Sequence, residues 1–141
     1  MNPLLIGIAG GSGCGKSTFS EALERRLSEY KTFLIHMNRY YRDPLPQIVS
    51  PVTQRPDVDW NHPDSLDYEK PLNLIKAIKA EHSYEIAIVE GAFLYCYDAK
   101  FQEQKYALPS RVYADIILNG YKLDGTALDV LLAWIQRKTQ Q

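Results

Sequence analysis

The sequence has little cysteine, little net charge and no long apolar run. Its 141 residues include two cysteines, and Cys14 and Cys96 have neither metal-ligand spacing nor a disulfide pattern. Few cysteines are typical of proteins kept in a reducing compartment, so we expect a cytoplasmic location. The three histidines, His36, His62 and His82, are too scattered to indicate a zinc site.

The near absence of net charge excludes further classes of partner. With a net charge of −1, the chain offers no electrostatic case for binding nucleic acid or an anionic membrane surface. No apolar run approaches the length of a membrane span, and Met1–Ala9 lacks the basic start of a signal peptide. The fractions of hydrophobic residues (45%) and charged residues (23%) are those of a globular protein. We expect one domain over residues 1–141 that binds a small molecule.

The order of apolar patterns predicts strands that alternate with helices. Leu4–Ala9 is typical of a strand buried on both faces, Lys16–Glu29 has helical spacing, and Thr32–His36 is a second strand candidate. Met37–Pro63 has no clear period and is long for a connection, so we interpret it as a substrate-facing loop with at most a turn of helix. The remaining predicted elements are a helix from Asp64 or Ser65 to about Glu81 that begins or kinks at Pro71, strands at Glu85–Val89 and Val112–Leu118, a turn at Asn119–Gly120, and a helix at Thr126–Gln136.

The segment Gly10–Ser17 matches the phosphate-binding pattern G-x-x-x-x-G-K-[ST] at every fixed position. Glycines let backbone N–H groups converge on phosphate oxygens, Lys16 reaches the β- and γ-phosphates, and the Ser17 hydroxyl completes a magnesium shell. The alternative is a glycine-rich turn with a chance lysine, which the preceding strand and following helix disfavour. The pattern predicts a P-loop NTPase-type three-layer α/β sandwich with a mostly parallel sheet that uses ATP and Mg²⁺. The residues expected to bind the nucleotide are Gly11, Ser12, Gly13, Cys14, Gly15, Lys16, Ser17 and Thr18.

Glu90 is the acid expected near the magnesium ion. It follows the apolar run Ile86–Val89 and precedes Gly91, so it should emerge at the carboxyl edge of the sheet, where ligands of open α/β folds collect. The alternative is an ordinary glutamate at a strand end. Its combination with an intact phosphate loop favours a role as metal ligand beside Ser17.

The stretch Ile6–Thr18 resembles the opening of the uridine kinase family, which includes nicotinamide riboside kinases and is related to phosphoribulokinase. The resemblance covers Met1–Tyr97 nearly continuously and resumes around Leu108. Further matching stretches are His36–Tyr41, Asp59–Ser65, Val89–Gly91 and Tyr113–Gly120.

The resemblance implies transfer of the ATP γ-phosphoryl group to a hydroxyl of a nucleoside or similar small molecule. It assigns Lys16 and Ser17 to the phosphates and magnesium and Glu90 to the metal. It also implies substrate contacts for four loop residues, namely Tyr41, Asp59, Trp60 and His62. Two alternatives stay open: Asp59 is equally typical of an exposed loop acid, and aromatic residues in a loop often anchor it to the core.

Two departures from the family pattern bear on catalysis. The family usually has an aspartate, as the base that orients the attacking hydroxyl, where this chain has Asn38, and an amide takes no proton at neutral pH. A natural replacement and an engineered one would look alike. The family also has several dozen more residues between the Glu90 strand and the last strand, including an arginine-bearing lid. Here the interval contains Cys96–Ser110, and the cations nearby are Lys100, Lys105 and Arg111.

Three explanations of the shortened interval stay open, namely a natural deletion, an engineered deletion and residues omitted from the written sequence. A missing strand would leave hydrophobic surface exposed, which leads to the hypothesis that the chain forms a homo-oligomer. For function, the first hypothesis is an ATP-dependent small-molecule kinase with Lys16, Asn38 and Glu90 as its catalytic residues. The second is a nucleotide-binding module with impaired or no catalysis. An NTPase switch is disfavoured because no stretch resembles a GTPase base-recognition motif.

Overall fold

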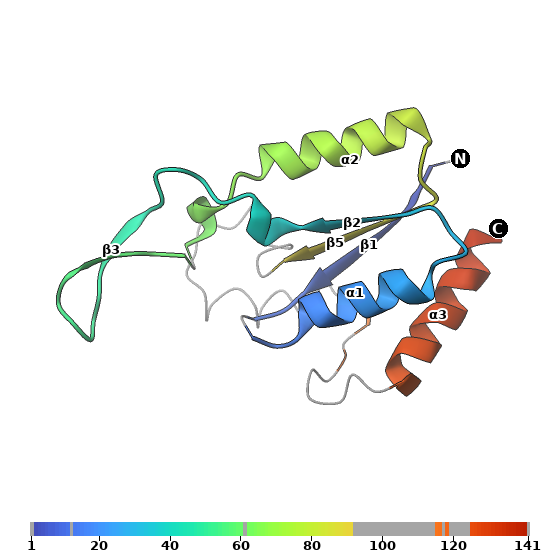
Figure 1. Cartoon of the computed structure of the whole chain (residues 1–141), viewed down its shortest axis with the longest axis horizontal. Helices are drawn as coiled ribbons and strands as arrows, with labels where there is room; N and C mark the ends of the chain where they lie inside the picture. The colour runs from blue at the N-terminus through green and yellow to red at the C-terminus, as the bar shows by residue number, and fades with distance from the viewer. Residues whose placement is uncertain are drawn as a thin grey trace.

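The fold is a parallel sheet between two layers of helices. The computed structural model describes residues 2–11, 13–60, 62–91, 115–116, 118 and 125–140. Among these residues, β1 (Leu4–Ala9), β5 (Ile86–Gly91) and β2 (Thr32–His36) form a sheet in the order β1-β5-β2, with both strand pairs parallel. Helices α1 (Lys16–Arg26) and α3 (Gly125–Thr139) lie on one face and α2 (Glu69–Glu81) on the other (Figure 1). This confirms the predicted α/β class with a parallel sheet.

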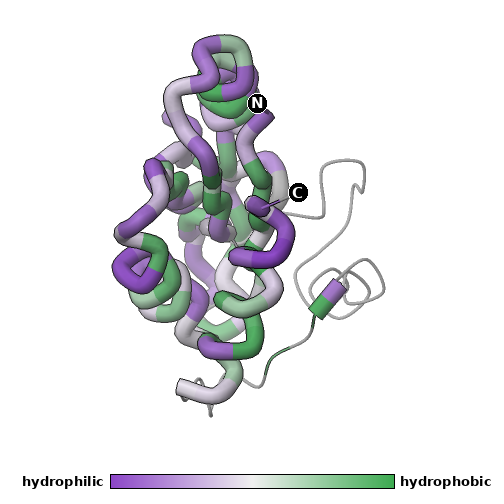
Figure 2. Tube along the Cα trace, turned by 90° about the vertical axis from the view of Figure 1, so that its right-hand side faces the viewer, coloured by the Kyte–Doolittle hydropathy of each residue, from purple (hydrophilic) through white to green (hydrophobic). Residues whose placement is uncertain are grey.

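The alternation of side chains along β5 divides the core into two halves. Ile86 and Ile88 point to the side of α1 and α3, where they pack with Leu23, whereas Val89 packs on the α2 side with Ile78. Burying one such side chain contributes about 1.5–3 kcal/mol relative to leaving it exposed. In Figure 2, hydrophobic and hydrophilic residues alternate along the helices, as expected for helices with one face on a core. Because successive side chains of a strand point to opposite faces, Glu90 lies on the α1 side of the sheet.

The burial of β1 differs from the prediction. All six residues of β5 are buried, but Leu5 in β1 is 46% exposed, and none of the other residues of β1 is fully buried. In the described part of the chain, β5 is the central strand and β1 lies at the end of the sheet. The prediction that β1 is buried on both faces is therefore wrong. The apolar residues of a strand do not determine which elements cover it.

Helix α1 begins where predicted and ends three residues early. The N–H group of Leu27 donates to the carbonyls of both Leu23 and Glu24 (3.0 and 3.1 Å), a tightened last turn that stops the helix. The N–H group of Tyr30 then donates to the Leu27 carbonyl at 2.9 Å and turns the chain toward β2. The predicted boundaries of β2 are confirmed, and β5 extends through Gly91.

The long loop contains a hairpin that the sequence analysis missed. It opens with the 3-10 turn η1 (Met37–Arg39), which confirms the expected turn of helix. The strands β3 (Gln47–Val49) and β4 (Pro56–Val58) then pair antiparallel, and all six of their residues are exposed. The hairpin projects from the carboxyl end of the sheet, whereas both chain termini lie at the opposite end (Figure 1). Strands of three residues, one beginning with proline and both without a buried face, have no detectable hydrophobic alternation.

The predicted helix from Asp64 or Ser65 is divided in two. The 3-10 turn η2 (Pro63–Ser65) comes first, Leu66 is extended, and α2 begins at Glu69, with Pro71 in its first turn. Its end at Glu81 is confirmed. Asp67 accepts a hydrogen bond from the Glu69 N–H group at 3.2 Å and pairs with Lys70 at 3.2 Å. The hydrogen bond from Lys70 is the main cause that lowers the pKa of Asp67.

The predicted C-terminal helix is confirmed and is longer than expected, since α3 spans Gly125–Thr139. Of the predicted strand Val112–Leu118, the structure describes Asp115, Ile116 and Leu118, and none of these three lies in a strand. The rest of that strand and the turn at Asn119–Gly120 fall outside the described residues, as does the interval Cys96–Ser110. Among the helices that the structure describes, none has the length and apolar composition of a membrane span.

Candidate active site

The glycine loop joins the carboxyl end of β1 to the first turn of α1. Gly13 and Gly15 have φ angles of 73° and 86°, in the left-handed region that favours glycine. Gly15 is the N-cap of α1, and no side chain in the described part of the protein caps the helix there. The first-turn N–H groups of a helix have no partner within the helix, so this turn presents donors at the edge of the sheet. Cys14 is exposed beside Gly13, Thr18 is exposed in the first turn, and Ser12 lies outside the described residues.

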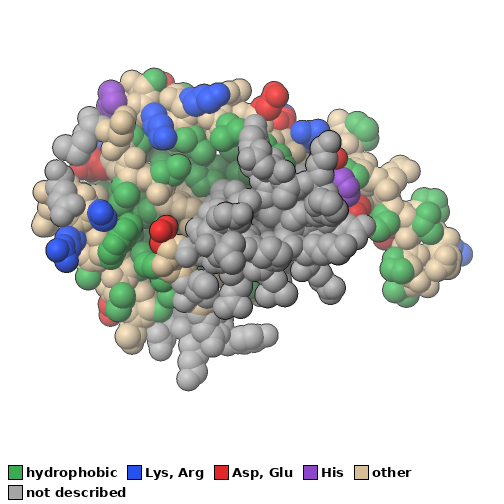
Figure 3. Space-filling view, turned by 180° about the vertical axis from the view of Figure 1, so that it is seen from behind, with side chains coloured by type: hydrophobic (Ala, Val, Ile, Leu, Met, Phe, Trp, Pro, Cys, Tyr) green, Lys and Arg blue, Asp and Glu red, His purple; other side chains and the backbone are tan. Residues whose placement is uncertain are grey.

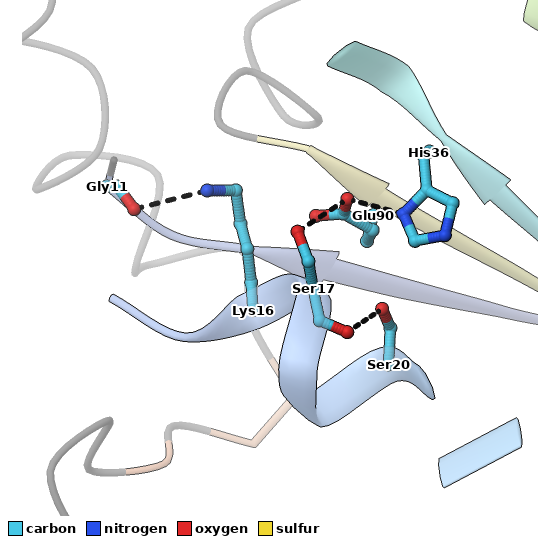
Figure 4. Close-up of polar contacts among 6 residues, drawn as sticks. All are labelled: Gly11, Lys16, Ser17, Ser20, His36 and Glu90. Atoms are coloured by element: carbon cyan, nitrogen blue, oxygen red, sulfur yellow. Dashed lines mark hydrogen bonds and ion pairs between the residues drawn. The ribbon is translucent and has the colours of Figure 1, made fainter. Parts of the chain in front are cut away.

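Lys16 folds back over the loop that precedes it. Its Nζ atom donates a hydrogen bond to the carbonyl oxygen of Gly11 at 3.2 Å (Figure 4). The ammonium group therefore lies above the same turn as the backbone donors. One positive charge and several N–H groups are thus gathered at one corner, where they complement a polyphosphate.

The Glu90 carboxylate connects this corner to the central strand. Its Oε1 atom accepts a hydrogen bond from the Ser17 hydroxyl at 3.0 Å, although the two residues are 73 positions apart. The same oxygen lies 2.8 Å from Nδ1 of His36 at the end of β2 (Figure 4). The Ser20 hydroxyl, fully buried, donates to the carbonyl of Ser17 at 2.9 Å and holds the first turn in place.

The second oxygen of Glu90 is an unusual feature. The side chain is 2% exposed, and its Oε2 atom has no hydrogen-bond partner among the described residues. A buried carboxylate oxygen without a partner is costly, by several kcal/mol when the group is charged. The arrangement is explained if this oxygen faces a group that the chain itself does not supply.

The oxygen donors at this corner fit magnesium. Mg²⁺ takes oxygen ligands and is usually held by one or two protein groups together with waters and substrate phosphates. Ser17 and Glu90 supply a hydroxyl and a carboxylate. Among the described residues, no three His, Cys, Asp or Glu side chains form a group that could hold a metal ion.

Asn38 lies at the same edge of the sheet but outside the hydrogen-bonded cluster. It is exposed in η1, two residues after His36. Gly91, the last residue of β5, lies close to this turn. A Cβ atom added at Gly91 would be 2.7 Å from Cβ of Met37. The position of Asn38 is therefore set by the packing of Met37 on β5.

The four predicted substrate residues lie at the two ends of the long loop, with Tyr41 near its start and Asp59, Trp60 and His62 near its end. Tyr41 and Trp60 meet edge to face, with ring centroids 5.0 Å apart and an interplanar angle of 90°. Tyr41 also packs on the core of the α2 side, whereas Trp60 is 51% exposed. Tyr41 thus anchors the loop to the core, which is the alternative to substrate binding, whereas the ring of Trp60 is accessible.

The other two residues organise the turn that follows. The carbonyl of Asp59 accepts from the N–H group of His62 at 3.4 Å, and Asp59 donates its own N–H group to the Pro46 carbonyl at 2.9 Å. Nδ1 of His62 accepts from the Asp64 N–H group at 3.1 Å. The contacts of His62 therefore cap η2. A structural role accounts for this ring nitrogen.

Sequence reasoning missed His36. It is the last residue of β2 and lies directly opposite Glu90 in the parallel register. The sequence contained a signal for this contact, because both residues lie at the carboxyl end of a predicted strand and these ends share one edge of a parallel sheet. What the sequence lacked was the strand order that makes β2 and β5 neighbours.

A parallel sheet with a glycine loop, a lysine and a serine at the strand-to-helix corner defines an α/β protein of the P-loop NTPase fold. The sequence model of the Phosphoribulokinase / Uridine kinase family matches residues 5–90. The chain belongs to this family, as its resemblance implied.

The curated relatives agree with the family. A uridine kinase of Leuconostoc citreum is 42% identical over 69 residues, which cover 48% of this chain and 31% of the relative. Uridine kinases of Clostridium tetani and Clostridium botulinum are 38% and 36% identical over 82 and 74 residues, covering 58% and 52% of this chain and 36% and 34% of the relatives. The chain thus spans about a third of the length of these relatives.

Proposed function

We propose that this chain binds ATP with magnesium and transfers the γ-phosphoryl group to a hydroxyl of a nucleoside or similar small molecule. The observation that carries the proposal is the meeting of Ser17 and Glu90 at 3.0 Å beside the lysine of the glycine loop. The names of the curated relatives, which are uridine kinases, support a nucleoside as the acceptor.

Each proposed role follows from the geometry of a side chain. Lys16 and the first-turn N–H groups of α1 hold the phosphates and neutralise their charge. The Ser17 hydroxyl donates a hydrogen bond to Oε1 of Glu90 and so keeps its lone pairs for a cation, while Oε2 of Glu90 offers a second oxygen. When bound, magnesium neutralises charge on the transferring phosphoryl group. Trp60 offers an exposed ring face for stacking on a flat base, and Tyr41 supports that ring from the core.

A second candidate function is a module that binds nucleotide without transferring phosphate. Asn38 favours it, because this exposed amide stands where the family resemblance implies a proton acceptor. General-base assistance contributes about 10²–10⁴ in rate, so its loss slows transfer severely. Asn38 still provides a hydrogen bond to a hydroxyl, which is compatible with slow transfer.

The two candidates are separated by product analysis. The whole chain is incubated with magnesium and ATP and with uridine, cytidine, nicotinamide riboside or pantothenate, and products are measured by mass spectrometry. A phosphorylated acceptor that disappears in Lys16→Ala supports the kinase. Stabilisation by ATP without a product from any acceptor supports the binding module, and absence of both effects contradicts the proposal.

A further inference from the structure

The contact between His36 and Glu90 has no role in the proposed function. His36 ends β2 and Glu90 precedes the last residue of β5, and the two are paired in the parallel register. Their side chains point to the same face, where Nδ1 lies 2.8 Å from Oε1. The histidine ring is 11% exposed and the carboxylate 2% exposed. Both groups are therefore held in a place where competing water is scarce.

Oε1 of Glu90 is shared by two side chains. The Ser17 hydroxyl donates to it, and His36 donates to it in the tautomer that carries its hydrogen on Nδ1. Two donors from different elements converge on one oxygen. The terminal torsion of a glutamate is broad by itself, and this pair of donors restricts it. The restriction leaves Oε2 as the oxygen without a partner among the described residues.

We infer that His36 is a positioning residue that holds the Glu90 carboxylate so that its second oxygen faces a divalent cation bound with the nucleotide. The inference rests on the proposed function for the presence of that cation. It extends the proposed function by one residue, His36, and one atom, Nδ1. The hydrogen bond from Nδ1 should govern the affinity for the metal while leaving the phosphate contacts of the glycine loop intact. Partners that orient metal ligands typically change metal affinity by about 10–100-fold when they are removed.

The bonded atom makes a matched set of substitutions available. The side-chain nitrogen of asparagine branches from Cγ, as Nδ1 of histidine does, so His36→Asn keeps a donor near its original place. The amide of glutamine lies one bond further out, near the position of Nε2, so His36→Gln keeps polarity and size but moves the donor. His36→Ala removes the donor entirely. A role in packing alone would rank these variants by volume, and glutamine would then be the best replacement.

The test measures metal and nucleotide binding separately. Binding of Mn²⁺ to the protein–ATP complex is followed by electron paramagnetic resonance, and binding of ATP alone is measured by calorimetry in EDTA. We expect His36→Ala and His36→Gln to weaken Mn²⁺ binding about tenfold or more, and His36→Asn to stay within about threefold of wild type. ATP binding in EDTA should be unchanged in all three variants.

Each contrary outcome has a distinct meaning. Equal Mn²⁺ affinity in wild type and His36→Ala, or a loss in His36→Asn as large as in His36→Ala, would overturn the inference and leave the proposed function standing. If His36→Ala does not fold, the comparison of His36→Gln with His36→Asn decides in the same way. Failure of the wild-type protein to bind ATP in EDTA or with Mn²⁺ would overturn the proposed function, and the inference with it.

Discussion

Lys16 is the residue whose charge the proposed function needs most. Its ammonium group lies over the glycine loop, where Nζ is 3.2 Å from the Gly11 carbonyl oxygen. We predict that Lys16→Ala weakens ATP binding at least about 100-fold, because charge-assisted contacts to phosphate are lost. Calorimetric titration measures this. Lys79→Ala is the matched control, since Lys79 is exposed near the end of α2, and retained affinity in Lys16→Ala would refute the site.

Asn38 tests whether one side chain limits catalysis. A carboxylate at this exposed position of η1 takes a proton where the amide does not. We predict that Asn38→Asp raises the rate of phosphorylated product formation at least about tenfold, without a comparable change in ATP affinity. Asn38→Ala serves as the control, and it should not raise the rate. An unchanged rate in Asn38→Asp would show that the amide is not the limiting defect.

At the scale of elements, the end of β5 sets the turn that follows β2. A Cβ atom at Gly91 would lie 2.7 Å from Cβ and 2.8 Å from Cγ of Met37. We predict that Gly91→Ala lowers the free energy of unfolding by about 1–3 kcal/mol, because η1 must move away from the strand. Urea denaturation provides the measurement. At Gly11 an added Cβ atom meets none of the described residues within 4 Å, so Gly11→Ala should change stability by less than about 0.5 kcal/mol.

The start of α2 gives a prediction about pH. Lys70 lowers the pKa of Asp67, so the carboxylate stabilises the folded state above its unfolded pKa and loses that effect as pH falls through the folded pKa. We predict a small advantage of wild type over Asp67→Asn at neutral pH that shrinks as the pH falls through the lowered pKa of Asp67. Urea midpoints of both proteins at several pH values measure it. Lys70→Ala should reduce the pH dependence, and a gap between wild type and Asp67→Asn that is constant with pH would contradict the assignment.

At the scale of the whole molecule, two exposed apolar features bear on self-association. Leu5 lies on β1 at the end of the described sheet, and the hairpin projects with Val49 and Val52 exposed, the latter by 89%. Figure 3 shows hydrophobic side chains on the projecting hairpin, seen from behind. Exposed apolar surface is one mark of contact sites between proteins. We therefore keep the hypothesis that copies of this chain associate.

Light scattering tests this hypothesis directly. We predict a mass of two or more chains at micromolar concentration. A lysine at an apolar interface opposes association, so Val49→Lys should restore the monomer if the hairpin mediates contact, and Leu5→Lys should do so if β1 does. A monomeric wild-type protein would contradict the prediction.

The elements that sequence reasoning located best are those with a long or strongly apolar pattern. The strand Thr32–His36, the apolar run before Glu90 and the helix Lys16–Arg26 were predicted to within a few residues. Both strands pack on the two halves of the core and the helix has one face on it, so each has a strong apolar pattern. The hairpin β3–β4 was missed since its residues are all exposed. The predicted start of α2 was too early because Leu66 is buried although it lies before the helix. Its spacing from the apolar residues of α2 extends their helical pattern toward the N-terminus.

Residues that are close together in the chain specify the strand, the glycine loop and the first helix, because the loop depends on local backbone freedom at Gly13 and Gly15 and on adjacent residues. The meeting of Ser17 and His36 on one oxygen of Glu90 depends instead on the tertiary structure. That meeting requires β2 and β5 to be neighbours in a parallel register and their side chains to share the face of α1. Strand order and register arise from packing of the whole core, and no short stretch of sequence contains them.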